Sequence, residues 1–153
     1  MSIEQPRVAA AQKPATDGSG SALRVMLVDD HALVRSAVRQ AITSPDVELV
    51  GEAGSAEDAF ALALALRPDV MLLDIDLPGM NGIQAAKSIR ASTQITKPPK
   101  IIMVTAYGRE EIMQQAEDLG IEGFLLKPVN ASMLFDTIMQ ALGKTAPGIS
   151  QVA

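Results

Sequence analysis

The sequence predicts an α/β fold in which a doubly wound (βα)5 sheet of five parallel strands carries helices on both faces. Short apolar segments alternate strictly with helical patterns, five times over, between residues 23 and 142. The segment 70–73 is apolar throughout, as expected of a strand that is buried on both faces. Strict alternation of strands and helices is typical of parallel sheets, and ligands of such sheets bind beyond the carboxyl ends of the strands.

Helix breakers and caps set the expected boundaries of these elements. Pro45 and Pro68 end the first two helices. Ser55 caps the second helix, with Asp58 three positions on as in a capping box, and Asn130 caps the fifth helix. We therefore expect strands at 23–28, 47–50, 69–73, 101–104 and 123–126, and helices at 32–43, 55–67, 83–91, 109–119 and 130–142.

The composition fits one folded domain with loose ends. Of the 153 residues, 48% are hydrophobic and 20% are charged, which is an ordinary balance for a globular domain. Residues 1–22 are polar and contain several Pro, Gly and Ser residues, so we expect a disordered leader there. The folded domain is expected at 23–142, followed by a flexible tail at 143–153.

Charge, cysteine content and hydropathy argue against several functions. The net charge is −5 and the basic residues form no cluster, so the chain is not expected to bind nucleic acid. It contains no cysteine, which excludes disulfides and thiolate metal sites. No apolar run approaches the roughly 20 residues of a membrane span, and no signal peptide is visible. We expect a cytoplasmic protein.

Acidic side chains stand at the ends of two of the expected strands. Asp29 and Asp30 follow the first strand, Asp74 follows the third, and Asp76 comes two residues later. Carboxylates that converge in one cleft repel one another, and a divalent cation relieves that repulsion. Because all of these ligands are hard oxygens, the site suits Mg²⁺, or Mn²⁺ in its place, better than zinc.

The fourth and fifth strands end in groups that suit a phosphoryl oxygen. Thr105 and Ala106 follow the fourth strand, and Lys127 and Pro128 follow the fifth. A carboxylate nucleophile, a metal ion, an ammonium group and a hydroxyl together make a site for phosphoryl transfer to aspartate. Simpler structural roles remain open for each residue alone, since aspartates cap helices well and a lysine can be a surface residue.

At these residues the sequence resembles the receiver domains of response regulators in two-component signalling. The resemblance covers roughly residues 23–142. It implies a flavodoxin-like fold with strand order 2-1-3-4-5. The matching positions are the acidic pair Asp29-Asp30, Asp74, the loop with Pro78 and Gly82, Thr105-Ala106 and Lys127-Pro128.

The resemblance implies a role for each acidic residue. Asp74 is the expected phosphoacceptor. Asp30 is expected to bind the metal directly and Asp29 mainly through water, while the backbone carbonyl of Asp76 provides a further ligand. Asp76 and Tyr107 also occupy positions at which relatives tune dephosphorylation.

The same resemblance implies a phosphoryl-stabilising group and a switch. Thr105 is expected to move toward the phosphoryl group, Lys127 to pair with it, and the small Ala106 to leave it access. The bond between Lys127 and Pro128 is expected to be cis. Phe124 occupies the position of the switch aromatic and would turn inward when Thr105 moves, and the alternative is a plain core residue.

Relatives also suggest partners. A histidine kinase or a histidine phosphotransfer protein is the expected donor, with contacts from Ala32, Leu33, Arg35 and Ser36 on the first helix. A homodimer through the face of helix four, strand five and helix five is a habit of the family. The N-terminal half is similar to receivers of helix-turn-helix regulators, and the C-terminal half to receivers of hybrid histidine kinases. The chain is therefore expected either to act alone by protein contact or to be the receiver of a longer protein.

Three other functions are weighed against this one. Asp74 and Asp76 after an apolar strand resemble the acidic pair of haloacid-dehalogenase phosphatases, but two strand–helix units precede them and only Asp136 follows Lys127. A receiver-like fold that serves only for protein interaction would not need the acceptor residues. A nucleotide-binding function is not favoured, because the sequence lacks the glycine-rich motifs of nucleotide-binding domains. We interpret His31 as a helix-start residue rather than as a metal ligand or phosphate carrier.

Overall fold

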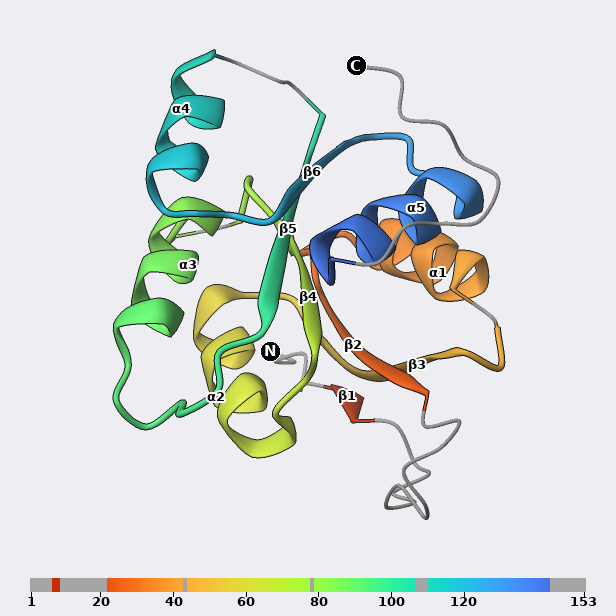
Figure 1. Ribbon diagram of the computed structural model, residues 1–153, viewed down its shortest axis with the longest axis horizontal. Helices are drawn as coiled ribbons and strands as arrows, with labels where there is room; N and C mark the ends of the chain where they lie inside the picture. The colour runs from red at the N-terminus through yellow and green to blue at the C-terminus, as the bar shows by residue number, and fades with distance from the viewer. Residues whose placement is uncertain (1–6, 9–21, 43, 78, 107–109, 144–153) are drawn as a thin grey trace, which may run out of the picture.

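A computed structural model of the protein describes residues 7–8, 22–42, 44–77, 79–106 and 110–143. It consists of one sheet between two layers of helices (Figure 1). The strands are β1 (Arg7–Val8), β2 (Leu23–Val28), β3 (Val47–Ala53), β4 (Val70–Asp74), β5 (Lys100–Thr105) and β6 (Gly123–Leu126). The helices are α1 (Ala32–Ala41), α2 (Ala56–Leu66), α3 (Gly82–Ala91), α4 (Glu110–Asp118) and α5 (Ala131–Ala141).

The sheet has the predicted parallel arrangement. Its order is β1-β3-β2-β4-β5-β6, so the five strands predicted from the sequence lie in the expected order 2-1-3-4-5. All four contacts among these five strands are parallel. The strand order reverses beside β2, and the ends of β2 and β4 therefore open into the same crevice.

A sixth strand, β1, was not predicted. Arg7 and Val8 pair antiparallel with Glu52 and Gly51 of β3 and extend the sheet at that edge. These two residues belong to the segment that we expected to be a disordered leader. The other residues of that segment up to residue 21, the tail from residue 144, Pro78 and Tyr107 lie outside the described residues.

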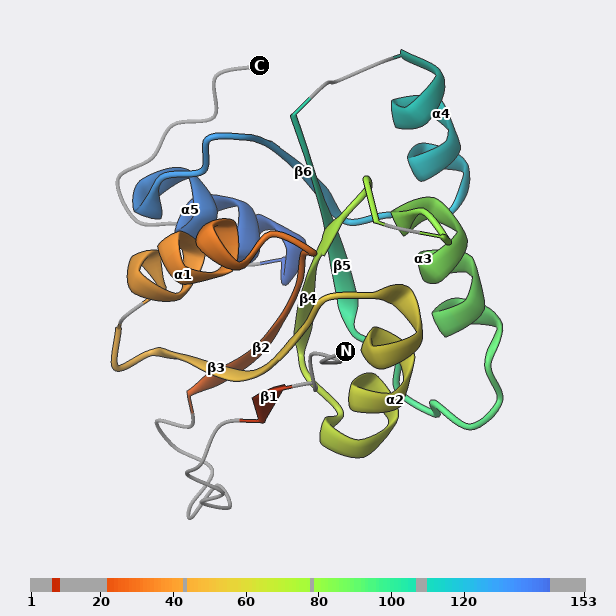
Figure 2. The same ribbon diagram turned by 180° about the vertical axis from the view of Figure 1, so that it is seen from behind.

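Alternate residues of each strand face opposite layers of helices. Met26 of β2 belongs to one core cluster with α2 and α3, whereas Leu27 belongs to a second cluster with α1 and α5. The views from opposite sides show α1 and α5 on one face of the sheet and α2, α3 and α4 on the other (Figures 1 and 2). Every residue of β4 is buried, as the apolar pattern predicted.

The boundaries differ from the predicted ones in places that matter for the site. β3 continues to Ala53, so Glu52 lies inside the strand rather than beyond its end. Ser55 accepts a hydrogen bond from the Asp58 N–H at 3.2 Å, as the predicted cap requires. Asn81 and Gln84 form a reciprocal capping box at the start of α3, which the sequence analysis had treated as a plain loop. Within the described part of the chain, none of the helices combines the length and apolar character that crossing a bilayer demands.

Gly82, the first residue of α3, lies against the backbone that carries Asp74. A Cβ atom at this position would stand 2.4 Å from the Asp74 carbonyl oxygen and 2.8 Å from the Ile75 Cα atom. The Gly82 N–H also donates a hydrogen bond to the Ile75 carbonyl at 2.8 Å. Only glycine allows α3 to back the loop after β4 this closely.

We predict that Gly82→Ala lowers the free energy of unfolding by about 1–3 kcal/mol, the usual cost of forcing extra atoms into a packed region. Alanine has a helix propensity about 1 kcal/mol better than glycine, so any loss has to come from the clash with the backbone. Urea unfolding measures the difference, with Ser88→Ala on the exposed side of the same helix as the control. Unchanged or increased stability of Gly82→Ala would contradict this account.

Candidate functional site

The predicted site residues come together at the carboxyl edge of the sheet. Asp29 follows β2, Asp74 is the last residue of β4, and Lys127 follows β6. The side chains of Asp29 and Asp74 are only 2% and 1% exposed. Lys127 Nζ lies 3.0 Å from Asp29 Oδ2 and 3.4 Å from Asp74 Oδ2. The site therefore holds two buried carboxylates bridged by one ammonium group.

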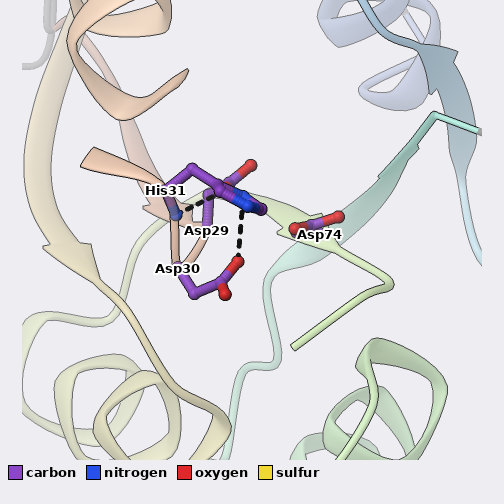
Figure 3. A group of neighbouring side chains, drawn as sticks. All are labelled: Asp29, Asp30, His31 and Asp74. Atoms are coloured by element: carbon purple, nitrogen blue, oxygen red, sulfur yellow. Dashed lines mark hydrogen bonds and ion pairs between the residues drawn. The ribbon is translucent and has the colours of Figure 1, made fainter. Parts of the chain in front are cut away.

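The carboxylates belong to a cluster that could surround a metal ion. One ligand atom from each of Asp29, Asp30, His31 and Asp74 lies within 4.8 Å of the others. The first three come from the junction of β2 and α1, and Asp74 faces them from β4 (Figure 3). The sequence analysis predicted the three aspartates but interpreted His31 only as a helix-start residue.

Burial shifts the acid–base behaviour of Asp74. Removal from water, followed by repulsion from Asp29, raises the pKa of the Asp74 carboxyl to about 6. Lys127 and the Asp76 N–H, which donates to Asp74 Oδ1 at 3.2 Å, act in the opposite direction and offset only part of this shift. Asp74 therefore carries its charge at neutral pH against an unfavourable environment.

In the same environment, the neighbouring carboxylates affect the pKa of Lys127 more strongly than burial does. Burial lowers the pKa of its ammonium group, but the hydrogen bond and charge of Asp29, together with Asp74, outweigh burial and raise it. Lys127 thus stays protonated throughout the neutral range. It provides a fixed positive charge between the two carboxylates.

The site also leaves one buried oxygen without a hydrogen bond. Asp74 Oδ2 is inaccessible to water and, among the described residues, receives no hydrogen bond, although Lys127 Nζ lies near it. A buried charged oxygen is costly to leave unsatisfied. A divalent cation held by Asp29, Asp30 and Asp74 would be coordinated by this oxygen. Carboxylate oxygens are hard ligands that suit such an ion. The expected role of the Asp76 backbone carbonyl stays a prediction.

The remaining predicted residues lie on β5, directly after it, on β6 and at the peptide bond after Lys127. Thr105 is buried at the end of β5, and its carbonyl accepts the Lys127 N–H at 2.9 Å. Ala106 is exposed beside it. Phe124 is half-buried and packs against the core on the α2 and α3 side of the sheet. The Lys127–Pro128 peptide bond is cis, as expected.

One expected partner contact is wrong. Ala32 and Leu33 are exposed and Ser36 is half-buried, but the Arg35 side chain is only 8% exposed. Its Nη1 donates to the Asp29 carbonyl at 2.5 Å, and its Nε lies 3.4 Å from Glu52 Oε1. Arg35 therefore holds the backbone of the acidic cluster in place from inside the protein and is not available to a partner.

Glu52 completes this buried ion-pair network, and it was not among the predicted site residues. Its two carboxylate oxygens accept hydrogen bonds from Arg39 at 2.7 and 2.9 Å, and it also pairs with Arg35. A buried Glu52 between two guanidinium groups links β3 to α1. The available signal was the spacing of Arg35 and Arg39, which places them on one helix face. Their partner could not be found without the sheet register.

A five-stranded parallel sheet of this order with an acidic cluster at its carboxyl edge defines the class of domain, and comparison with known families identifies that class. The family model described as "Response regulator receiver domain" matches residues 25–139. The chain therefore belongs to the response regulator receiver domain family of two-component signalling, as the resemblance implied.

Several individual proteins resemble this chain. The nitrate/nitrite response regulator NarL of Escherichia coli K12 is 34% identical over 131 residues, covering 85% of this chain and 56% of NarL. The transcriptional regulatory protein PdtaR of Mycobacterium tuberculosis is 33% identical over 132 residues, covering 86% of this chain and 62% of PdtaR. The chain thus spans little more than half the length of these curated relatives.

Solved structures give the same assignment. The signal receiver domain of the M. tuberculosis response regulator NarL superposes with a TM-score of 0.73 and 35% identity, covering 80% of this chain and 98% of that domain. The response regulator domain of Thermotoga maritima CheB also has a TM-score of 0.73, with 32% identity, and covers 82% of this chain and 100% of that domain.

The raised pKa of Asp74 predicts that this residue destabilises the metal-free domain at neutral pH. Because the native pKa of about 6 exceeds the unfolded value of 3.8, the native state binds the proton more tightly. Its contribution to stability is therefore full below about pH 4 and is lost as pH rises through 6. Asp74→Asn should raise the free energy of unfolding by about 1–3 kcal/mol at pH 7.5, and much less at pH 4.

Urea unfolding in EDTA at both pH values measures this difference. Asp76→Asn, which alters an exposed carboxylate two residues away, is the matched control and should have little effect at either pH. An Asp74→Asn variant no more stable than the wild type at pH 7.5 would show that Lys127 neutralises the carboxylate completely.

Proposed function

We propose that this domain is a cytoplasmic phosphoacceptor switch. Asp74 takes a phosphoryl group from a histidine kinase or a histidine phosphotransfer protein with the help of Mg²⁺, and the phosphorylated domain presents an altered protein-interaction surface. The observation that carries the proposal is the buried Asp74 Oδ2, which accepts no close hydrogen bond among the described residues and has the Lys127 ammonium 3.4 Å away.

The chain's own residues support the chemistry of transfer. Asp29, Asp30 and Asp74 would hold Mg²⁺, which neutralises their charge when bound and favours the approach of an anionic phosphoryl group. An Asp74 oxygen attacks the phosphorus, the bond from phosphorus to the donor's imidazole nitrogen breaks, and the imidazole leaves. Lys127, already within 3.4 Å of Asp74, provides a cation for the transferred oxygens.

The conformational response to phosphorylation would be transmitted from the end of β5 to β6. Thr105 is the proposed switch hydroxyl and Phe124 the aromatic that follows it, since the β5–β6 register sets Thr105 opposite Leu126 and Met103 opposite Phe124. Three large apolar side chains are exposed on the elements α4, β6 and α5, namely Met113, Leu126 and Met133. They support the proposal of a docking or homodimer face there, formed by protein rather than nucleic acid contacts.

We also propose that the domain acts on no external substrate and catalyses only its own phosphorylation and dephosphorylation. The phosphatase alternative has less support. Its second acidic pair would have to come after Lys127, where the sequence has only Asp136, and that residue lies on α5. The acidic cluster around Asp74 instead contains Asp29 and Asp30, which directly follow β2.

Incubation with acetyl phosphate and Mg²⁺ should add one phosphoryl group to the intact protein, because the small donor needs no docking surface. Intact mass spectrometry should show no such gain for Asp74→Asn, or for the wild type in EDTA. Asp118→Asn, at the exposed end of α4, is the matched aspartate control and should be labelled like the wild type. Labelling that persists in Asp74→Asn would move the acceptor to another residue.

The exposed start of α1 predicts a separate effect on the protein donor. Leu33 is 85% exposed beside the acidic cluster, so Leu33→Asp should slow transfer from a phosphorylated histidine kinase about fivefold or more. Transfer from acetyl phosphate should stay unchanged. The kinase is one chosen from a purified panel because it labels the wild type, and Met113→Asp on α4 serves as the control. Equal slowing with both donors would place the defect in the site itself.

A further inference from the structure

His31 adds a nitrogen donor to a cluster otherwise made of carboxylates. Its ring lies between Asp29 and Asp30 and faces the side on which Asp74 stands (Figure 3). We propose that His31 is a ligand of this metal site and that it increases the preference of the site for late first-row divalent ions, such as Ni²⁺ and Co²⁺, over Mg²⁺ beyond what the oxygen ligands provide. The inference rests on the metal site of the proposed function and adds a ligand to it.

The spacing of the donor atoms supports this assignment. His31 Nδ1 lies 3.1 Å from Asp30 Oδ1 and 3.3 Å from Asp29 Oδ1. In an octahedral site with metal–ligand distances of about 2.1 Å, neighbouring ligands stand about 3.0 Å apart. The nitrogen and the two oxygens therefore already have nearly the spacing of adjacent ligands. Asp74 completes the cluster, with all four donor atoms within 4.8 Å of one another.

The backbone fixes where His31 stands and leaves its ring free to adjust. The His31 N–H donates to Asp29 Oδ1 at 2.9 Å, which ties the residue to the buried carboxylate. His31 is the N-cap residue of α1, but its side chain makes no capping hydrogen bond. The side chain is 62% exposed, so a small rotation of the ring toward an ion would disturb no packing.

A second, independent observation points to a cation in this cluster. The side chain of Asp74 is 1% exposed, and among the described residues its Oδ2 accepts no close hydrogen bond and has only the Lys127 ammonium as an ion-pair partner, at 3.4 Å. His31 has no such need, because its Nδ1 can donate to the neighbouring carboxylates when no metal is bound. A cation shared by all four groups would give the buried Asp74 oxygen a second positive partner beside Lys127.

A comparison of two metal ions shows whether His31 acts as a metal ligand or only as a hydrogen-bond donor. Imidazole nitrogen suits Ni²⁺, Co²⁺ and Zn²⁺, whereas Mg²⁺ prefers oxygen and keeps water ligands. Removing a ligand nitrogen should therefore weaken Ni²⁺ binding much more than Mg²⁺ binding. If His31 acted only through a hydrogen bond or a charge, both ions would respond alike.

The test compares the metal affinities of the untagged 153-residue chain at a single pH of 7.5. Isothermal titration with NiCl₂ and with MgCl₂ is carried out on the wild type, His31→Gln and His31→Ala. We expect Ni²⁺ affinity to fall about tenfold or more in both variants, with Mg²⁺ affinity within about twofold of the wild type. Asp30→Asn is the control and should weaken both ions. Equal shifts for both ions, or none for Ni²⁺, would overturn the proposal.

The composition provides a direct spectroscopic readout. The chain contains one histidine and no cysteine, so any imidazole coupled to a bound ion belongs to His31. With Cu²⁺ as the probe, pulsed electron paramagnetic resonance should show modulation from the remote imidazole nitrogen in the wild type and none in His31→Gln. A wild type without this modulation would overturn the proposal.

Acetyl phosphate labelling of the same samples separates this inference from the proposed function. If the wild type binds Mg²⁺ and is labelled on Asp74, but the His31 variants keep the wild-type Ni²⁺ affinity and no imidazole coupling appears, only the role of His31 fails. If the wild type binds neither ion and is not labelled, both the metal site and the proposed function fail.

Discussion

The repulsion between two buried carboxylates, Asp29 and Asp74, is the constraint on which the rest of this structure depends. Lys127 lies within hydrogen-bonding distance of Asp29 and near Asp74, yet the pKa of Asp74 remains raised to about 6. One ammonium group therefore neutralises the pair only in part. A fold that keeps such charges at the end of a buried strand has to hold them rigidly, because any relaxation that separates them or admits water would relieve the strain.

The apolar sheet and two braces provide that rigidity. β4 is buried along its whole length between two core clusters, so Asp74 cannot retreat into solvent by shifting the strand. Gly82 lets α3 touch the backbone of Asp74 from one side. On the other side, Arg35 holds the Asp29 carbonyl and is itself held by Glu52. The charges are thus positioned by packing and by a buried ion-pair network rather than by the loops alone.

Sequence patterns reveal some of this arrangement and hide the rest. The strands and the convergence of Asp29, Asp74 and Lys127 could be predicted from these patterns, since parallel strands bring their carboxyl ends to one edge. The strand order followed only from the family resemblance. The burial of Arg35 could not, because its partner Glu52 lies on a different element and the predicted strand ended before it. β1 is two residues long and offers no periodic signal. The place of the His31 ring depends on the turn after β2, which sequence periodicity does not describe.

The buried pair Asp29 and Asp74 and the exposed pair Asp30 and His31 have different surroundings, and each pair therefore contributes differently to the site. Asp29 and Asp74 are almost wholly buried, so their charges interact strongly and set the electrostatics of the site. Asp30 and His31 stand on its exposed side, where an ion that entered the site would meet them first. Three consecutive residues at the end of β2 thus pass from a buried charge to an open donor. A site that is both charged and accessible needs such a gradient, because a fully buried cluster would exclude the ion and a fully exposed one would bind it weakly.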